Sequence, residues 1–499
     1  MKVCTAGEMR KVDAFSIEQL NIPGIVLMEN AASSCTREIA GFDSFVIVVG
    51  KGNNGGDGLA IARQLINLGK KAEVYLVFAD EFSGDAKINR EILKNMNVEV
   101  KSCDDLDAFT VSVKTADCVV DAIFGTGIKG EVTGRAKNVI EIINEHSKYT
   151  LSVDVPSGIN SDNGEVSSAT VNADKTVTFA AYKKGMLLYP AADFTGEVVV
   201  ANIQIPQMVF DELGIKINTT DEDFAAKLMP KRSKNSHKGD YGKILVIGGK
   251  TGMGGAVYLS SLAALKMGAG LVTVCIPNEL SGYIKELPPE VMTSLSDFEK
   301  DADKIADMVN NYDAVLFGNG IGREENVINL LEKILDKIEV PIVIDADGLF
   351  ALSKFPEKIR GKKAILTPHS MEMARLLDVG AEDVEKNRFE FSKDFAEEYG
   401  VTLVLKGNHS IITAPDGAQN VNMTGNSGMA TAGSGDVLAG MTVALLAITE
   451  PFSAATLAVH IHGKAGDYAK DRLSETSVTA GDIMEAIPHI LPVENTKNM

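Results

Sequence analysis

The glycine-rich corner at residues 50–55 is the first pattern with a chemical meaning. Gly50, Gly52 and Gly55 have the G-x-G-x-x-G spacing of a dinucleotide-binding turn, between an apolar run and a segment with helical periodicity. Such a turn also calls for an acidic residue at the end of the next strand, and Asp80 comes late for that role. The glycine spacing alone therefore does not indicate hydride transfer, and Asp57, taken by itself, would also fit a helix-capping carboxylate.

Acidic and polar residues end two later apolar runs of the same half. Asp121 ends one run, and Asp154 and Ser157 follow another. The carboxyl ends of parallel strands meet in one crevice, so these residues and the amides of Asn53 and Asn54 predict an oxygen-rich pocket. Hard cations prefer oxygen ligands, and an amide-rich set with few charges suits a monovalent ion.

A run of small residues in the second half, "GNSGMATAGSGD", leads into a strongly apolar helical segment. The first turn of such a helix has free N–H groups that bind anions such as phosphate. Asp436 lies at this helix start, where the simplest alternative is a capping carboxylate. A carboxylate beside a transferring phosphoryl group is, however, the expected general base for an attacking hydroxyl, and we interpret Asp436 in this way.

Two more residues of the second half stand at strand ends. Lys406 precedes a tight turn, where a lysine can pair with a nucleotide phosphate or simply extend into solvent. His369 follows Pro368 at a strand-to-helix corner, with Glu372 three residues further on. In isolation, a histidine at such a corner is more often a polar corner residue than a catalytic one.

The elements that must position these residues alternate along the chain. Short apolar runs alternate with helical stretches from the N-terminus to about Ile205, and again from Lys243 onward. This alternation predicts βαβ units and a mostly parallel sheet in each half. The polar stretch between the halves, which includes "PKRSKNSHKG", predicts an exposed linker. We therefore predict an α/β protein with domains at residues 1–216 and 241–499, joined by a linker at 217–240.

Composition excludes several classes of protein. The chain has 499 residues, 45% of them hydrophobic, and a formal charge of −19, which argues against nucleic acid and anionic membranes as partners. We recognise no signal peptide, and no apolar run is long enough to span a bilayer. Five scattered cysteines, none in a C-x-x-C pattern, favour a reducing cytoplasm and provide no metal framework.

Three motifs of the first half, "GKGNNGGDGLAIAR", "DAIFGTGIKG" and "VDVPSG", resemble the N-terminal domain of bifunctional NAD(P)H-hydrate repair enzymes. The resemblance implies a Rossmann-like three-layer epimerase domain that interconverts the R and S epimers of NADHX and NADPHX, which carry a hydroxyl at C6 of the nicotinamide ring. It implies a K⁺ site at Asn54, Asp121 and Ser157, and we expect Asp154 to be the acid–base catalyst. Lys183 matches a lysine position of the family. The substrate-binding residues that it implies are Asn53, Asn54, Gly55, Gly56, Asp57, Gly125, Thr126, Gly127, Ile128, Lys129, Gly130 and Glu131.

Nearly the whole second half resembles the C-terminal domain of the same family, a ribokinase-like, ADP-dependent NAD(P)H-hydrate dehydratase. The resemblance implies that the hydrate is bound by Ala256, Gly320 and His369, beside the catalytic Asp436. The nucleotide-binding residues that it implies are Lys406, Gly407, Asn408, His409, Ser410 and Gly435. Mg²⁺ is expected to neutralise the nucleotide phosphates.

The second half departs from the family pattern at three places. It has "AGSGD" where "GGTGD" is common, Phe350 where an asparagine is usual, and Ser410 where the family has threonine. The first and last changes keep size or chemistry. Phe350 changes any contact that the asparagine side chain makes.

The resemblance implies a two-step repair. The epimerase, an isomerase, supplies the S form, and the dehydratase, a lyase, restores NAD(P)H at the expense of ADP, giving AMP and phosphate. We expect only small-molecule partners, which are the two hydrates and an adenine nucleotide, and a homo-oligomeric, cytoplasmic protein. Three alternatives stay open: a small-alcohol or vitamin kinase in the second half, a non-catalytic ligand-binding or scaffolding domain in the first, and a dehydrogenase.

Overall fold

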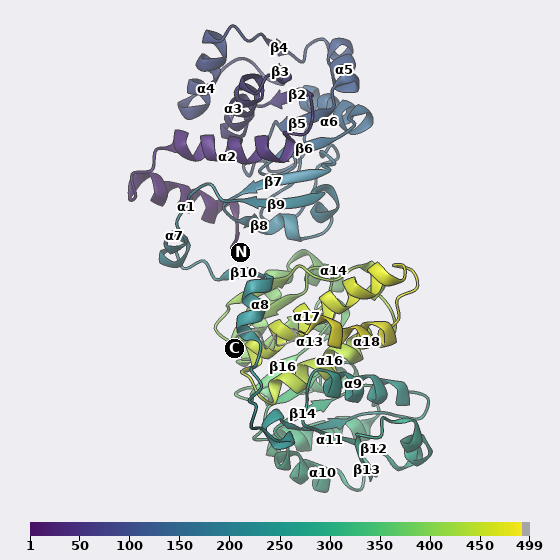
Figure 1. The fold of residues 1–499 in the computed structure, drawn as a ribbon. Helices are drawn as coiled ribbons and strands as arrows, with labels where there is room; N and C mark the ends of the chain where they lie inside the picture. Colours follow the sequence, from purple (N-terminus) through teal and green to yellow (C-terminus); the bar gives the residue numbers. More distant parts are fainter. Residues whose placement is uncertain (492–499) are drawn as a thin grey trace. The chain divides into compact units, whose positions relative to one another are not determined.

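The computed structural model describes residues 1–491, which form two compact units (Figure 1). The first unit is Met1–Ile217 and the second begins at Asn218. Each unit has its own large sheet flanked by helices, as the alternation of strand-like and helical runs predicts.

The first unit is built on a seven-stranded, wholly parallel sheet with the strand order β4-β3-β2-β5-β6-β7-β9. The chain proceeds from β2 toward β4 on one side and from β5 toward β9 on the other, which is the order of a Rossmann-like sheet. The direction of progress therefore reverses between β2 and β5, and this leaves a crevice beyond their carboxyl ends. The strands are β2 (Ser44–Val49), β3 (Lys71–Leu76), β4 (Val100–Ser102), β5 (Cys118–Ala122), β6 (Thr150–Val153), β7 (Lys175–Phe179) and β9 (Glu197–Ala201).

Helices cover both faces of this sheet. In β2, Phe45, Ile47 and Val49 pack with α2 and α3, whereas Val46 and Val48 pack with α5 and α6. The period of two puts successive side chains on opposite faces, so a strand that is buried on both faces is apolar throughout. The helices are α1 (Ala6–Glu18), α2 (Gly24–Ile39), α3 (Asn53–Asn67), α4 (Gly84–Asn95), α5 (Leu106–Thr115), α6 (Gly134–His146) and α7 (Gln207–Glu212). A separate parallel pair joins β1 (Val3–Cys4) to β8 (Tyr182–Lys183).

The second unit is built on a ten-stranded sheet with the order β10-β19-β18-β17-β16-β15-β14-β11-β12-β13. The strands from β17 to β13 in this order are parallel, whereas β18 and β19 follow β17 as antiparallel strands. The direction of progress reverses here too, between β11 and β14. The strands are β10 (Ile217–Thr220), β11 (Lys243–Ile247), β12 (Leu271–Pro277), β13 (Met292–Ser296), β14 (Ala314–Phe317), β15 (Ile342–Ile344), β16 (Ala364–Leu366), β17 (Thr402–Leu405), β18 (Ile411–Thr413) and β19 (Gln419–Asn422).

Two helical layers enclose this second sheet. One apolar cluster joins the sheet to α9, α16, α17 and α18, and the other joins it to α10, α11, α12, α13 and α15. Residues Val437 to Leu446 of α16 are buried along their whole length, which explains why this segment is apolar on every side. The helices are α8 (Glu222–Leu228), α9 (Gly254–Lys266), α10 (Ala302–Met308), α11 (Glu325–Lys337), α12 (Asp347–Leu352), α13 (Ser370–Leu377), α14 (Ala381–Lys386), α15 (Arg388–Tyr399), α16 (Ser434–Leu446), α17 (Pro451–Arg472) and α18 (Ala480–Ile490).

The stretch that the sequence predicts as a linker is partly folded onto the second unit. It contains β10, an edge strand of the large sheet, and α8, which packs against α17 and pairs Glu222 with Lys464. An edge strand and a surface helix need few apolar residues, so their composition is similar to that of a linker.

The five cysteines are all buried and unpaired by disulfides. Burial raises the pKa of each thiol, to about 12 for Cys4 and Cys103. Within residues 1–491, no helix has the length and hydropathy required to cross a membrane.

A close helix crossing supports a stability prediction. A Cβ atom at Gly440 of α16 would lie 2.1 Å from the carbonyl oxygen of Ser260 in α9, so the two helices would have to separate. We expect Gly440→Ala to lower the free energy of unfolding by about 1–3 kcal/mol, the usual effect of overpacking. Gly481→Ala is the matched control, because the nearest atom to its Cβ would lie 3.6 Å away. Urea unfolding of both variants is the measurement, and an unchanged midpoint for Gly440→Ala would contradict the close approach.

Candidate active sites

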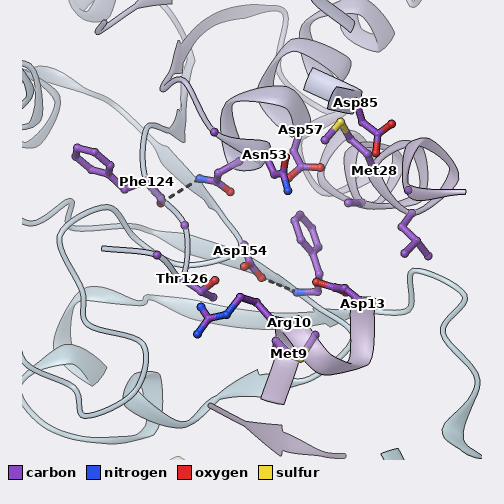
Figure 2. A pocket seen from close by; sticks show the side chains of 18 of the residues that line it. Met9, Arg10, Asp13, Met28, Asn53, Asp57, Asp85, Phe124, Thr126 and Asp154 are labelled. Atoms are coloured by element: carbon purple, nitrogen blue, oxygen red, sulfur yellow. Dashed lines mark hydrogen bonds between the residues drawn. The ribbon is translucent and has the colours of Figure 1, made fainter. Parts of the chain in front are cut away.

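The first candidate site is a cavity of about 640 Å³ at the reversal point of the first sheet. Asn53, Asn54 and Asp57 line it from the corner after β2, and Asp154 lines it from the end of β6. Figure 2 shows Asn53, Asp57 and Asp154 at this cavity. Of the side chains that the sequence predicts to meet at the carboxyl ends of the strands, Asn53, Asn54 and Asp154 line the cavity, whereas Asp121 and Ser157 are fully buried and are not among its lining residues.

The glycine corner allows this close approach of chain segments. A Cβ at Gly50 would lie 1.9 Å from the carbonyl oxygen of Ile123, and a Cβ at Gly55 would lie 2.0 Å from that of Gly50. Any side chain at these two positions would push α3 away from β2 and β5. A Cβ at Gly56 would lie 2.7 Å from that of Ala86, so Gly56 also allows close packing, and neither Gly55 nor Gly56 is among the residues that line the cavity.

Asn54, Asp121 and Ser157 form one buried polar cluster. The Ser157 hydroxyl donates to Asp121 Oδ1 at 2.6 Å, and Asn54 Nδ2 donates to the carbonyl oxygen of Phe124 at 3.0 Å. Asp121 has no exposed surface, and burial raises its pKa against the opposing effect of the Ser157 hydrogen bonds. Among residues 1–491, Asn54 Oδ1 is buried without a hydrogen-bond partner, and an unsatisfied buried acceptor of this kind is a free ligand atom for a cation.

Asp154 forms an ion pair with a fully buried lysine. Lys183 Nζ donates to Asp154 Oδ1 at 2.5 Å, and also to the Thr178 hydroxyl at 2.8 Å and to the carbonyl oxygen of Phe179 at 2.9 Å. Asp154 has a φ of 67°, a left-handed conformation uncommon outside glycine that often marks functional positions. All side-chain hydrogen bonds that Asp154 accepts within residues 1–491 go to Oδ1, so Oδ2 has no partner there.

Only the first part of the loop after β5 lines the cavity. Gly125, Thr126, Gly127 and Ile128 line the cavity, whereas Lys129, Gly130 and Glu131 are not among the lining residues. Glu131 instead accepts hydrogen bonds from the backbone and hydroxyl of Ser168, which lower the pKa of its carboxyl. The binding roles predicted for these three residues stay predictions.

Residues that sequence reasoning missed reach the first cavity from the N-terminal helix. Met9, Arg10 and Asp13 line it from α1, and Asp85 from α4 (Figure 2). The only signal for the α1 group is that positions 9, 10 and 13 share one helix face. Burial raises the pKa of Asp13 to about 6, and it raises the pKa of Asp57 well above the usual range.

The second candidate site surrounds Asp436, at the reversal point of the larger sheet. Asn319, after β14, donates its amide to Asp436 Oδ1 at 2.6 Å and to Asp345 Oδ2 at 3.2 Å. Asp345, after β15, accepts from Lys406 Nζ at 2.8 Å and from the Thr367 hydroxyl at 2.7 Å. Strand ends of β14, β15, β16 and β17 thus supply one hydrogen-bonded network, of which the sequence prediction included only Asp436 and Lys406.

Burial raises the pKa of Asp436 to about 6, with the Asn319 hydrogen bond opposing the shift and Asp345 adding to it. Burial alone would lower the pKa of Lys406, but the carboxylates of Asp345 and Glu372 outweigh this effect and raise the pKa above its usual value. A carboxylate with a pKa near 6 is ionised at neutral pH and still basic enough to accept a proton. The surroundings therefore suit Asp436 to general-base chemistry.

The N-terminus of α16 is open to an anion. Its N-cap, Gly433, has a φ of 90° and no side chain caps the helix. The N–H groups of Gly435 and Asp436 lie in the first turn, which has no intrahelical acceptors for them. A Cβ at Gly435 would lie 3.6 Å from Lys406 Nζ, so a lysine ammonium lies beside the helix start. The helix dipole of α16 and the Lys406 ammonium together favour binding of a phosphate at this helix start.

Three further predicted residues of the second half are His369, at the start of α13, and the neighbouring pair Ala256 and Gly320. His369 caps α13, pairs with Glu372 at 3.4 Å and has a pKa lowered by burial and by Lys406. A Cβ at Gly320 would lie 2.9 Å from that of Ala256, so those two residues adjoin.

The loop from Gly407 to Ser410 is the tight turn between β17 and β18. The Ser410 hydroxyl accepts from the Gly407 N–H at 3.3 Å and donates to the Gly407 carbonyl oxygen at 3.0 Å, so this serine closes the turn. Asn408 and His409 lie at the tip of the turn. Phe350 is half-buried and has three cationic groups over its ring, those of Arg323, Lys354 and Arg375, so it carries contacts of its own.

Neither site contains a cluster typical of a transition-metal centre. No group of three or more His, Cys, Asp or Glu side chains that could hold a metal ion occurs in residues 1–491. The oxygen-rich set at Asn54 does not count as such a cluster, because it combines amide, hydroxyl and carboxylate groups.

Comparison with known proteins identifies both halves. Residues 244–489 match the family described as NAD(P)H-hydrate dehydratase, and residues 24–185 match the family described as YjeF-related protein N-terminus. A structure of the ADP/ATP-dependent NAD(P)H-hydrate dehydratase of Bacillus subtilis, co-crystallised with ATP/Mg²⁺, is 31% identical to this chain with a TM-score of 0.51. It covers 55% of this chain and 98% of its own.

Two curated relatives extend the similarity to the full length. The bifunctional NAD(P)H-hydrate repair enzyme Nnr of Moorella thermoacetica is 38% identical, over 98% of this chain and 97% of its own length. The protein of the same name in Escherichia coli K12 is 31% identical, over 94% of this chain and 89% of its own length. The chain therefore belongs to the family of bifunctional NAD(P)H-hydrate repair enzymes.

Proposed function

We propose that the chain repairs hydrated nicotinamide nucleotides in two steps. The first unit interconverts the R and S epimers of NADHX and NADPHX, and the second unit dehydrates the S epimer with ADP, giving NAD(P)H, AMP and phosphate. The observation that supports this most directly is the position of Asp436, a half-buried carboxylate with a pKa near 6, at the open N-terminus of α16 beside Lys406. A base, an anion site and a cation in one place suit phosphoryl transfer to a hydroxyl.

The dehydration follows from these groups. Asp436 accepts the proton of the C6 hydroxyl as the oxygen attacks the terminal phosphoryl group of the nucleotide. The N–H groups of Gly435 and Asp436 and the ammonium of Lys406 stabilise the charge on the transferring phosphoryl group. Phosphate then leaves C6, pushed out by the ring nitrogen, and loss of a proton from the adjacent carbon restores the dihydronicotinamide. A bound Mg²⁺ would neutralise the nucleotide phosphates. The relative from Bacillus subtilis was co-crystallised with ATP/Mg²⁺.

For the first unit, we propose that the cavity holds the nicotinamide hydrate, with Asp154 exchanging a proton with it. The residues around Asn54 fit a K⁺ ion for two reasons. Within residues 1–491, Asn54 Oδ1 is a buried acceptor without a partner, and the buried carboxylate of Asp121 forms no ion pair with a lysine or arginine. Asn54, Asp121 and Ser157 would hold the ion, which would fix the loop after β5 against α3. We also propose a cytoplasmic location, on the five unpaired thiols, and assembly as a homo-oligomer.

The proposal is tested by supplying the purified protein with an epimer mixture of NADHX, ADP, Mg²⁺ and K⁺. Absorbance at the NADH band should return completely, and free phosphate should equal the NADH formed. A stable phosphorylated product without NADH would show a kinase instead.

Asp436→Asn should abolish dehydration of the S epimer, with a loss of about 1,000-fold or more in kcat. In the wild type the rate should fall as pH drops through about 6, because the carboxylate must be ionised to accept the proton. Asp471→Asn, at an exposed position of α17, is the matched control and should keep both the rate and the pH dependence. Full activity in Asp436→Asn would refute the mechanism.

Asp154→Asn should leave only the S share of the mixture consumed within the assay time. The second unit continues to dehydrate that epimer, whereas the R epimer accumulates because its proton exchange has lost the carboxylate. Chromatography of the two epimers during the reaction is the measurement. Complete consumption at the wild-type rate would show that Asp154 is dispensable.

K⁺ should accelerate epimerisation of pure R-NADHX several-fold over choline, measured without nucleotide so that the second unit is idle. Asp121→Asn should lose this response, because the buried carboxylate is the only charged member of the proposed ligand set. An identical wild-type rate in choline and K⁺ would contradict the cation site.

A further inference from the structure

The N-terminal helix α1 supplies the first cavity with a carboxyl group that lies outside the matched family segment, residues 24–185. Met9, Arg10 and Asp13 line the cavity from one face of α1, and Asp13 points toward Asp154 in Figure 2. Asp13 makes no hydrogen bond or ion pair within residues 1–491, so its oxygens are available to a ligand in the cavity.

The position of Asp13 is fixed through the backbone next to Lys183. In the short parallel sheet, Cys4 of β1 is paired with Lys183 of β8. Helix α1 begins two residues later, with a capping box between Thr5 and Glu8 and with the Ala6 N–H bonded to Asp162 at 2.6 Å. The strand pairing therefore ties the helix that carries Asp13 to the lysine that pairs with Asp154.

The surroundings of Asp13 favour a carboxyl that exchanges protons near neutral pH. Burial raises its pKa to about 6, the Lys183 ammonium opposes the shift and Asp154 adds to it. The other titratable and charged groups that face it or share its cavity are Asp57 of α3, Asp85 of α4, Lys51 before α3, Cys4 of β1 and Arg10 of its own helix. Asp154, by contrast, is already ion-paired through Oδ1, and its Oδ2 has no partner in the described part of the chain.

Inversion at C6 needs one proton donor and one proton acceptor. A donated proton lets the C6–O bond break with its electron pair going to oxygen, so that water leaves and the ring nitrogen forms a C=N double bond. Water then adds to the opposite face of C6, and its proton passes to an acceptor. One proton is given and one is taken, so two carboxyl groups with different surroundings suffice.

We propose that Asp13 and Asp154 are the two proton-transfer groups of the epimerase, one donating to the departing hydroxyl and the other accepting from the incoming water. The roles exchange for the reverse reaction. This inference rests on the proposed epimerase function, which it deepens by naming the second catalytic residue.

The test compares Asp13→Asn with wild type in the full chain, following conversion of R-NADHX to S-NADHX by chromatography, without nucleotide and across pH 5–9. We expect kcat to fall about 100-fold or more, with KM changed less than about threefold. The wild-type rate should decline above about pH 6 as Asp13 loses its proton, and Asp13→Asn should lack that decline. Asp13→Glu, which keeps the carboxyl, should restore part of the rate and the decline.

Glu18→Gln, at an exposed position of the same helix, is the matched control and should keep the wild-type rate and pH profile. Dehydration of S-NADHX with ADP should be unchanged in every variant. The inference is overturned if Asp13→Asn retains the wild-type rate, or if Asp57→Asn and not Asp13→Asn removes the decline above pH 6. A wild-type protein that does not interconvert the epimers at all would instead overturn the proposed function.

Discussion

Both candidate sites depend on one topological constraint, the reversal of strand order within a parallel sheet. In the first unit the reversal separates β2 from β5, and in the second it separates β11 from β14. The loops beyond these strands turn in opposite directions and leave space between them, which loops elsewhere along the sheet edge do not. The glycine corner at Gly50 and Gly55 and the open start of α16 are adaptations of the chain to this space.

The two sites use this space with opposite electrostatics. The first gathers Asp13, Asp57 and Asp154 around a lysine that is already ion-paired, so it suits proton exchange with an uncharged hydroxyl or water. The second places the carboxylates of Asp436 and Asp345 beside the Lys406 ammonium and the first-turn N–H groups of α16, so it suits a migrating phosphoryl group. Repair of the substrate requires both proton exchange and phosphoryl transfer. Two sites serve it, because neither site has the charged groups that the other reaction requires.

The sequence predicted the fold class and the strand-end residues, because these depend on local periodicity and on short motifs such as residues 50–57 and 431–436. It did not predict Asn319 and Asp345, although each ends an apolar run, because their role appears only when four strand ends meet around Asp436. Asp13 was missed for a different reason: its helix reaches the cavity through a pairing between β1 and β8 that joins residues about 180 positions apart. The edge strand β10 was mistaken for linker because its surroundings, not its composition, make it a strand.

The complete burial of the five thiols has a consequence for handling and for cellular stress. A thiol reacts with peroxides and alkylating agents as its anion, and burial in apolar surroundings suppresses that anion as well as the reagent's approach. Neither catalytic step requires sulfur. The folded enzyme should thus endure oxidants that inactivate thiol-dependent enzymes.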